Sequence, residues 1–167
     1  MQWSQRDPSA LLPVPPPHVP PSSDAVVGPV VDAKGNQSWF LGNQLHRDND
    51  LPAFIGANGG NKRWYQHGKL HRDNDLPAKV NANGSMSWYQ HGKLHRDGDA
   101  PAVIEANGSQ QWYKRGQLHR DGDQPAQITK TSMSWYWRGQ RHRDDNQPAV
   151  IRRDGTMQFW KHGVKIA

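Results

Sequence analysis

The tripeptide His-Arg-Asp is the part of this sequence that most resembles catalytic chemistry, because it occurs in the catalytic loop of protein kinases. It is present five times, beginning at His46, His71, His95, His119 and His142. A kinase also needs a glycine-rich phosphate loop, a strand lysine and a metal-binding Asp-Phe-Gly, and the sequence contains none of them. A catalytic residue is not copied five times, so we expect a protein that is not an enzyme.

The five histidines could instead form an array of metal ligands. They recur once per repeat, which places neighbours two strands apart, about 9.6 Å at about 4.8 Å per strand. A zinc ion needs ligands about 2 Å away, so two such histidines lie too far apart to share one. His67 and His91 lie closer in sequence to a repeated histidine, but only two units have such a pair. We therefore expect structural histidines, arginines paired with nearby aspartates, and no metal or cofactor.

Short acidic loops follow the histidines and resemble fragments of calcium-binding loops. A calcium ion takes six to eight oxygen ligands, whereas each loop offers two carboxylates and then Leu, Ala or Gln before a proline. The simpler expectation is an Asx turn, in which the aspartate accepts hydrogen bonds from backbone N–H groups. Calcium binding stays open as an alternative. The carboxylate pairs are Asp48 and Asp50, Asp73 and Asp75, Asp97 and Asp99, and Asp121 and Asp123.

All these residues belong to a repeat. The five histidines are separated by 25, 24, 24 and 23 residues. A proline six residues later keeps the same step, at Pro52, Pro77, Pro101, Pro125 and Pro148. A tryptophan seven residues earlier does so too, at Trp39, Trp64, Trp88, Trp112 and Trp135. Self-similarity with a fixed period near 24 predicts a repeat architecture in which these tryptophans and histidines are structural.

One unit, residues 88–108, reads WYQHGKLHRDGDAPAVIEANG and predicts two strands. The first, Ser85–Gln90, ends at a two-residue turn, and the second, Ala102–Ala106, ends at Asn107-Gly108, a strong hairpin signal. No helical period is present. The sequence thus predicts an all-β fold, an elongated antiparallel hairpin meander of about five 24-residue units and 11 or 12 strands. Half units cap it: Pro29 is expected in the proline position, and residues 164–166 in place of Leu-His-Arg.

Neighbouring residues of a strand point to opposite faces, so the tryptophans and the residues after them predict two aromatic columns. The second column comprises Phe40, Tyr65, Tyr89, Tyr113, Tyr136 and Trp160. A single sheet cannot cover both columns. Exposed aromatic rings beside basic residues can stack on nucleic-acid bases or anchor a protein interface. We therefore assign partner binding to the second column.

The first 25 residues differ in composition from the repeats. Seven prolines between Pro8 and Pro21 predict an extended, polyproline-II-prone arm that can join neither a sheet nor a helix. Its candidate partner-binding side chains are Trp3, Leu11, Leu12, Val14 and Val19. The sequence therefore divides into an arm, residues 1–25, and a repeat domain, residues 26–167.

Composition limits the remaining possibilities. Only 34% of the 167 residues are hydrophobic and there is no cysteine, which excludes disulfides and thiolate metal sites. The net charge of +6 permits a nucleic-acid or anionic-membrane partner, but most arginines adjoin acids, which indicates local pairing. No apolar run is long enough to span a membrane, and the N-terminal residues do not resemble a signal peptide.

The pattern WYxxGxLHRDxDxPAxI…NG resembles the MORN-like repeats of bacterial and bacteriophage proteins, over roughly residues 28–167. The resemblance implies an elongated, twisted β-meander that acts as a scaffold or docking surface, with protein or lipid contacts and no catalytic machinery.

We therefore expect a structural or interaction protein that the arm tethers to other protein subunits of a larger assembly, with no small-molecule substrate. A bacteriophage virion component, such as a decoration or tail accessory protein, is the specific expectation. The location would be the virion or the cytoplasm of a bacterial host. The alternative is a repeat protein that binds nucleic acid or an anionic membrane through its basic, aromatic face.

Overall fold

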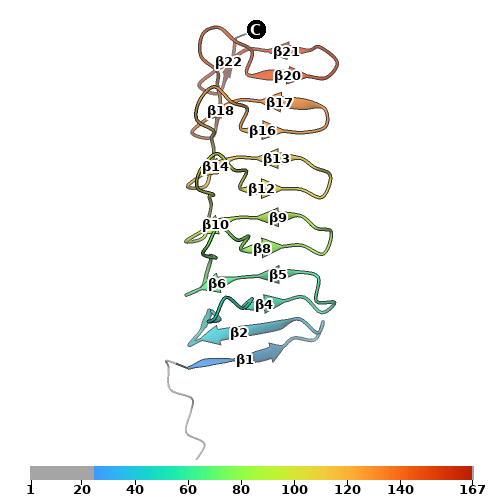
Figure 1. The fold of residues 1–167 in the computed structure, drawn as a ribbon, viewed down its shortest axis with the longest axis vertical. Helices are drawn as coiled ribbons and strands as arrows, with labels where there is room; N and C mark the ends of the chain where they lie inside the picture. Colours follow the sequence, from blue (N-terminus) through green and yellow to red (C-terminus); the bar gives the residue numbers. More distant parts are fainter. Residues whose placement is uncertain (1–24, 167) are drawn as a thin grey trace, which may run out of the picture.

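The computed structural model describes residues 25–166, and every regular element in that range is a β-strand. Twenty-three short strands, all paired antiparallel, stack along one long axis (Figure 1). This confirms the predicted fold class, an elongated β-hairpin repeat. The predicted arm lies outside the described residues, except for Ala25.

One long sheet runs the length of the array. Each unit contributes two of its strands, which pair with each other and with the neighbouring units in sequence order. The strands are β1 (Val26–Val31), β2 (Gln37–Leu41), β4 (Phe54–Ile55), β5 (Lys62–Arg63), β8 (Lys79–Val80), β9 (Met86–Ser87), β12 (Val103–Ile104), β13 (Gln110–Gln111), β16 (Gln127–Ile128), β17 (Ser132–Ser134), β20 (Val150–Arg152) and β21 (Met157–Gln158), with β3 (Gln44–Leu45) paired to β2.

A ladder of small hairpins runs beside this sheet. The hairpins are β6–β7 (Tyr65–Gln66, Lys69–Leu70), β10–β11 (Tyr89–Gln90, Lys93–Leu94), β14–β15 (Tyr113–Lys114, Gln117–Leu118), β18–β19 (Tyr136–Trp137, Gln140–Arg141) and β22–β23 (Trp160–Lys161, Val164–Lys165). Each is joined to the hairpin before it; for example, the Gly92 N–H donates to the Leu70 carbonyl at 2.8 Å.

The tryptophan of each unit connects the sheet to the hairpin. The Trp88 N–H donates to the Ala102 carbonyl at 2.8 Å, and the Trp88 carbonyl accepts from the His95 N–H at 3.1 Å. The single strand predicted for 85–90 is therefore divided at Trp88 into β9 and β10. This division, together with an unpredicted return strand such as β11 in each hairpin, explains why 23 short strands are seen where 11 or 12 were expected.

Two kinds of turn close the strands. The hairpin turns have both central residues in the left-handed region, such as His91 at φ 49° and Gly92 at φ 84°, as the expected two-residue turns require. At the opposite edge the Gly108 N–H donates to the Glu105 carbonyl at 2.9 Å, and Asn107 Oδ1 accepts from the Ser109 N–H.

The repeats differ in length by one residue, and the difference lies in the turns at that opposite edge. In the 24-residue repeat His95–His119, the Glu105 N–H bonds the Ser109 carbonyl. In the 25-residue step the bond runs from Gly56 to Asn61, and in the 23-residue step from Thr129 to Ser132. The turns thus gain or lose one residue, which leaves the His-Arg-Asp side of the array in register.

The N-terminal half unit is shifted by one residue from the prediction. Val30 pairs with Ser38 as Val103 pairs with Gln111, so Pro29 stands in the alanine position and Gly28 in the proline position. A Cβ at Gly28 would lie 2.6 Å from the Trp39 ring. The first tryptophan therefore packs where only a glycine leaves space.

The C-terminal half unit is likewise shifted by one residue. Lys165 pairs with Trp160 as Leu94 pairs with Tyr89, and the Ile166 N–H donates to the Phe159 carbonyl. Ile166 thus occupies the histidine position, and the predicted placement of residues 164–166 was wrong by one residue.

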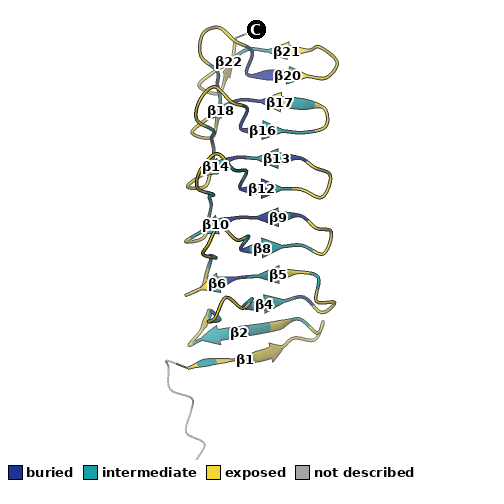
Figure 2. Cartoon of the chain, viewed as in Figure 1, coloured by how far each residue is buried: buried dark blue, intermediate teal, exposed yellow. Residues whose placement is uncertain are grey.

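The core is a narrow line of small and aromatic side chains along the junction between the sheet and the hairpins (Figure 2). The alanine after each proline is completely buried, at 0% exposure in all five units, and the five tryptophans are 6–8% exposed. The alanines are Ala53, Ala78, Ala102, Ala126 and Ala149.

We predict that Ala102→Leu lowers the free energy of unfolding by about 1–3 kcal/mol, because the extra carbons have no space beside Trp88. Ala106→Leu, at an exposed position of the neighbouring turn, is the matched control and should change it by less than about 0.5 kcal/mol. Chemical denaturation followed by tryptophan fluorescence measures both. Equal effects of the two substitutions would contradict this description of the core.

Candidate functional site

The residues whose side chains could take part in catalysis or metal binding lie in five loops that follow the hairpins. In four of these loops the two residues after the first aspartate are in the left-handed region; Asn49 and Asp50, for example, have φ 59° and 53°. Asparagine, aspartate and glycine tolerate this conformation best, which accounts for the Asp-Asn-Asp and Asp-Gly-Asp sequences. The bent loop directs its last aspartate toward the next unit.

In every unit after the first, the arginine reaches back to that last aspartate of the unit before it. Arg96 Nε and Nη2 donate to Asp75 Oδ1 and Oδ2 at 2.8 and 2.7 Å, a bidentate ion pair between residues 21 apart in sequence. Arg96 Nη1 also donates to the Pro101 carbonyl of its own loop at 3.3 Å. Arg72, Arg120 and Arg143 repeat the same contacts with Asp50, Asp99 and Asp123.

The same arginine covers the tryptophan of its own unit. The Arg96 guanidinium lies over the Trp88 ring at 4.0 Å, within the range of a cation–π contact. The Trp88 Nε1–H donates to the Asp75 carbonyl at 2.9 Å, so one aspartate holds both the arginine and the indole of the next unit. The tryptophan column is therefore the column that the loops cover.

The repeated histidine connects its own loop to the following hairpin. His71 Nε2 lies 3.1 Å from Asp73 Oδ1, and His71 Nδ1 accepts a hydrogen bond from the His91 N–H at 3.2 Å. Because Nδ1 is an acceptor, the proton of the neutral ring is on Nε2 and points to the carboxylate. All five repeated histidines make both contacts, at 2.8–3.2 Å and 3.1–3.4 Å.

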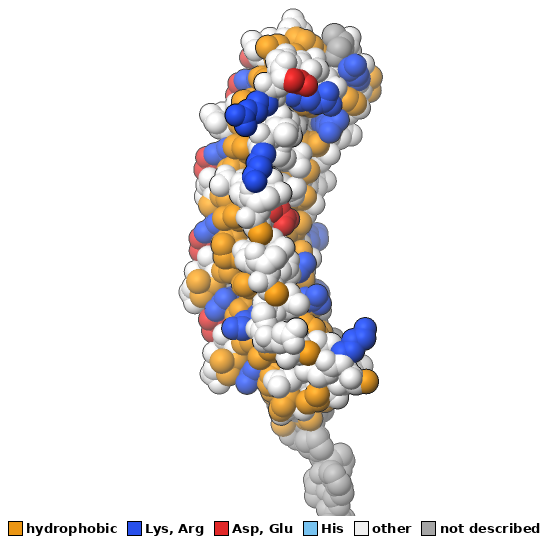
Figure 3. All heavy atoms as spheres, turned by 90° about the vertical axis from the view of Figure 1, so that its right-hand side faces the viewer, with side chains coloured by type: hydrophobic (Ala, Val, Ile, Leu, Met, Phe, Trp, Pro, Cys, Tyr) orange, Lys and Arg blue, Asp and Glu red, His pale blue; other side chains and the backbone are white. Residues whose placement is uncertain are grey.

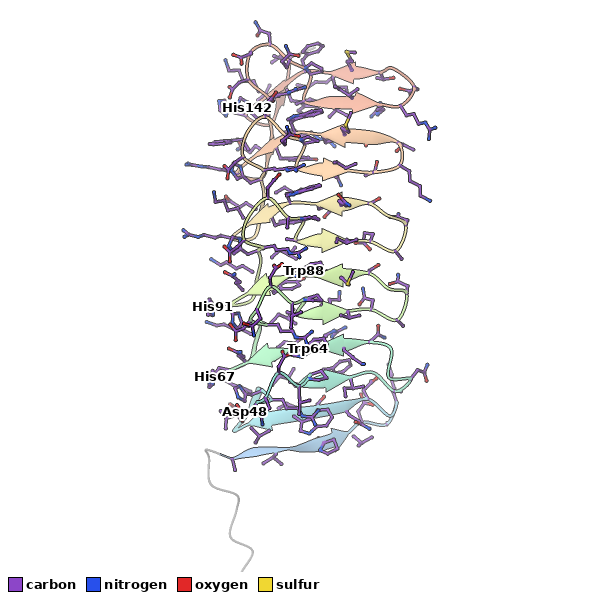
Figure 4. The ribbon with its side chains drawn as sticks, in the orientation of Figure 1. Asp48, Trp64, His67, Trp88, His91 and His142 are labelled. Carbon is purple, nitrogen blue, oxygen red and sulfur yellow. The ribbon has the colours of Figure 1, made fainter. Side chains whose placement is uncertain are left out.

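Three of these histidines also stack on a second histidine in the turn of the next hairpin. His71 and His91 are stacked with centroids 4.6 Å apart, and His142 and His162 with centroids 4.3 Å apart. His46 and His67 are tilted at 4.6 Å. The turn histidines His67 and His91 lie one above the other at the hairpin side of the array (Figure 4).

The two aspartates of a loop thus have different partners, and neither behaves as predicted. The first binds a histidine and the last binds the arginine and indole of the next unit, so the expected Asx capping in these loops is wrong. Asx capping occurs instead at the opposite turns, where Asn83 Oδ1 accepts from the Ser85 N–H at 3.0 Å. The expected arginine–aspartate pairing is present, but it joins different units.

The arginine contacts also change the acidity of the loops. The hydrogen bonds from Arg96 hold the pKa of Asp75 below its ordinary value of 3.8, and Arg72, Arg120 and Arg143 do the same for Asp50, Asp99 and Asp123. Asp121 also has a lowered pKa, with Lys114 as the main cause. At neutral pH these loops therefore carry ionised aspartates that are already paired.

The histidine, arginine and aspartate side chains of the loops bond mainly to groups within the array. Both ring nitrogens of each repeated histidine are engaged, and nowhere in residues 25–166 do three His, Asp or Glu side chains gather as metal ligands do. Shallow clefts separate successive loops, for example between the loops of His95 and His119, but the histidine and arginine side chains in their walls are those already bonded. This arrangement can hold repeats together; it presents no free acid–base pair.

The second aromatic column is half-buried throughout, and its tyrosines line the clefts between successive loops, as Tyr65 and Tyr113 do. The Tyr113 hydroxyl donates to Gln111 Oε1 at 3.2 Å, and Arg141 Nε donates to the Tyr136 hydroxyl at 3.0 Å. Burial raises the pKa of Tyr89, and neighbouring Tyr65 adds to the effect. Seen from the turn edge, hydrophobic side chains extend along the molecule; acidic side chains lie mainly along one side, whereas Lys and Arg side chains are spread over both sides (Figure 3).

The remaining predicted site residues lie in the arm. Trp3, Leu11, Leu12, Val14 and Val19 are outside the described residues. Between residues 25 and 166 there is no helix of the length and apolarity needed to span a membrane. Comparisons of this chain with family models, curated proteins and solved structures find no match.

Sequence reasoning missed the partner of each arginine, although a signal for it exists. In the last loop the position of Asp50, Asp75, Asp99 and Asp123 is taken by Asn146, and the arginine position of the following half unit is Ala167. Aspartate thus changes to asparagine in the one loop that no arginine follows. This covariation within a single chain indicates a contact between units.

We predict that a double-mutant cycle of Arg96→Ala and Asp75→Ala gives a coupling free energy of about 0.5–1 kcal/mol, the upper range for exposed pairs, because the contact is bidentate. Lys114 and Asp121, which share a single 3.0 Å contact within one hairpin and loop, form the control pair and should couple more weakly. Urea denaturation of the four variants in each cycle gives the values. Stronger coupling in the control pair would contradict the assignment.

We predict that acid destabilises the array through the aspartates that bind arginine. Their pKa values are lower in the folded chain than the 3.8 of an unfolded aspartate, so their contribution is complete above about pH 5 and is lost as the pH falls below 3.8 through the folded values. The urea midpoint should therefore fall over this window. Asp75→Asn should lower the midpoint at pH 7 and flatten the acid slope; an unchanged slope would contradict the prediction.

Proposed function

We propose that this protein is a non-enzymatic scaffold of the MORN-like kind, held in a larger assembly by its Pro-rich arm. The observation that carries the proposal is that loop side chains bond across units: four of the five loop arginines pair with an aspartate of the unit before, as Arg96 does with Asp75, and each repeated histidine accepts a hydrogen bond from the next hairpin. A set of side chains that is repeated and mutually bonded serves to fix one unit on the next. What remains for binding is the arm and the face with the second aromatic column.

The specific form that we propose is a bacteriophage virion component, either a decoration or a tail accessory protein. Its support is the likeness of the repeats to bacterial and bacteriophage MORN-like units, together with an elongated body preceded by a Pro-rich segment of different composition. A rigid body that carries an extended arm can contact several subunits of a particle at once. This assignment rests on analogy with the fold class.

A nucleic-acid or anionic-membrane partner is the second candidate, favoured by the net charge of +6. Four loop arginines weaken this candidate, because each is bound bidentately to an aspartate and so offers little to a phosphate. Lysines such as Lys69 and Lys93 in the hairpins remain exposed. Binding through them would be salt-dependent, with a log–log slope that counts the phosphate contacts.

We predict that deletion of residues 1–24 abolishes incorporation into particles and leaves the repeat array folded. The measurement is the copy number of the chain in purified particles by quantitative mass spectrometry, with circular dichroism of the isolated variant as the folding control. A variant with Trp3, Leu11 and Leu12 changed to serine should show the same loss, because these are the arm's largest apolar side chains.

Equal incorporation of the deleted and full chains would refute the role of the arm. Binding of the full chain to duplex DNA or to anionic vesicles, with affinity that falls steeply as salt rises, would instead favour the second candidate.

A further inference from the structure

The second aromatic column places one aromatic ring in each unit at a regular spacing. Tyr65, Tyr89 and Tyr113 each open the small hairpin of their unit, and successive units are two strands apart in the main sheet. The column spacing is therefore about 9.6 Å. From Phe40 to Trp160 there are five such intervals, or about 48 Å.

This spacing matches the pitch of a polyproline-II helix. Such a helix rises about 3.1 Å per residue with three residues per turn, or about 9.3 Å per turn. A polyproline-II segment that lies along the column therefore presents the same side to one aromatic ring after another. Segments of this kind bind to aromatic surfaces because their conformation is already formed and little entropy is lost.

The column also offers the hydrogen-bond donors that such a segment requires. A polyproline-II backbone has carbonyl groups without internal partners. Among residues 25–166 the hydroxyls of Tyr65 and Tyr89 have no hydrogen-bond partner, and since no buried side-chain N or O atom is left unpaired, these hydroxyls are at least partly accessible to solvent. Burial raises the pKa of Tyr89, so its hydroxyl keeps the proton that it would donate.

The chain itself contains a segment of this kind. Residues 8–21 read PSALLPVPPPHVPP and include seven prolines. In the polyproline-II conformation these 14 residues extend about 43 Å, close to the length of the column. The segment contains no Asp, Glu, Lys or Arg, so it adds no charge to a face where the tyrosines are accompanied by Gln111 and Gln127 in the later units and by Arg63 and Lys79 in the earlier ones.

We propose that the aromatic column is the docking surface for the Pro-rich arm, residues 8–21, of a second copy of this chain. The column and the arm are different surfaces of the same molecule, so the contact is heterologous and joins copies into a closed ring or an open chain. This proposal deepens and rests on the proposed function, since it names a neighbouring copy as one subunit that the arm holds.

The position at which the arm joins the array favours a second copy. Ala25 precedes β1, whose Val26 and Val27 pair with Leu41 and Phe40. Strand β1 runs along the strand direction, at a right angle to the column, and only residues 22–25 separate it from Pro21. An arm that lay along its own column would therefore need a turn of about a right angle within this short link, residues 22–25.

Sedimentation velocity of the full chain over a range of concentrations tests the proposal. We expect the weight-average sedimentation coefficient to rise with concentration above that of the monomer. Pro15→Ala, Pro16→Ala and Pro17→Ala together should weaken the association about tenfold, and the array cannot unfold because the changes lie in the arm. The double substitution Tyr65→Leu with Tyr89→Leu should weaken the association to a similar extent, because it changes the column that receives the arm.

Met133→Ser is the matched control. Met133 is exposed and precedes Ser134, which pairs with Gln127, so it lies on the face opposite the tyrosines. It should leave the association unchanged, and circular dichroism checks that all variants stay folded.

Chymotrypsin cleavage at Leu11 distinguishes the remaining outcomes. We expect arm protection that increases with protein concentration. A monomer whose arm is cleaved at every concentration overturns the proposal, and so does a monomer whose arm is protected, since its own column would then hold it. Neither outcome affects incorporation into particles. The proposed function is therefore tested separately, by the copy number of the chain in purified particles.

Discussion

The bidentate contact between each arginine and the aspartate of the preceding unit is the constraint on which the array depends. It holds the guanidinium flat over a tryptophan that already donates its indole N–H to the same aspartate's carbonyl. A tryptophan on a sheet this thin would otherwise face water on the loop side. No unit can make this contact by itself, because Arg96 needs Asp75, so the stability of each repeat depends on its neighbours.

The same dependence explains the two ends. At the start, Arg47 lies over Trp39 and donates to the Pro52 carbonyl, but within residues 25–166 no aspartate faces its Nε and Nη2. At the other end the aspartate position is Asn146, which removes a charge where no arginine follows. The sequence therefore changes at the C-terminal half unit, whereas Arg47 is retained in the first unit.

Much of the fold follows from the sequence. Period, turn residues and strand propensity predict a hairpin meander, and the structure confirms it. The division at Trp88 could not be predicted, because it depends on backbone bonds to Ala102 and His95 that come from different parts of the unit. The register of Pro29 was wrong for a related reason: proline suggests the alignment, but the position of the turn after Val31 and the Trp39 ring beside Gly28 decide it.

The candidate site was harder to predict, since residue type and spacing do not show which partner a side chain has. His-Arg-Asp suggests that the three neighbours act together, whereas His95 bonds Asp97 and Arg96 bonds Asp75. Once these contacts are counted, the loop face has few groups free for a ligand. In the second aromatic column the hydroxyls of Tyr65 and Tyr89 have no hydrogen-bond partner within residues 25–166, whereas those of Tyr113 and Tyr136 do. Because the loop residues and the aromatic column differ in this way, contacts between units and contacts with a partner can use separate residues of the same repeat. The number of units can then change without altering either kind of contact.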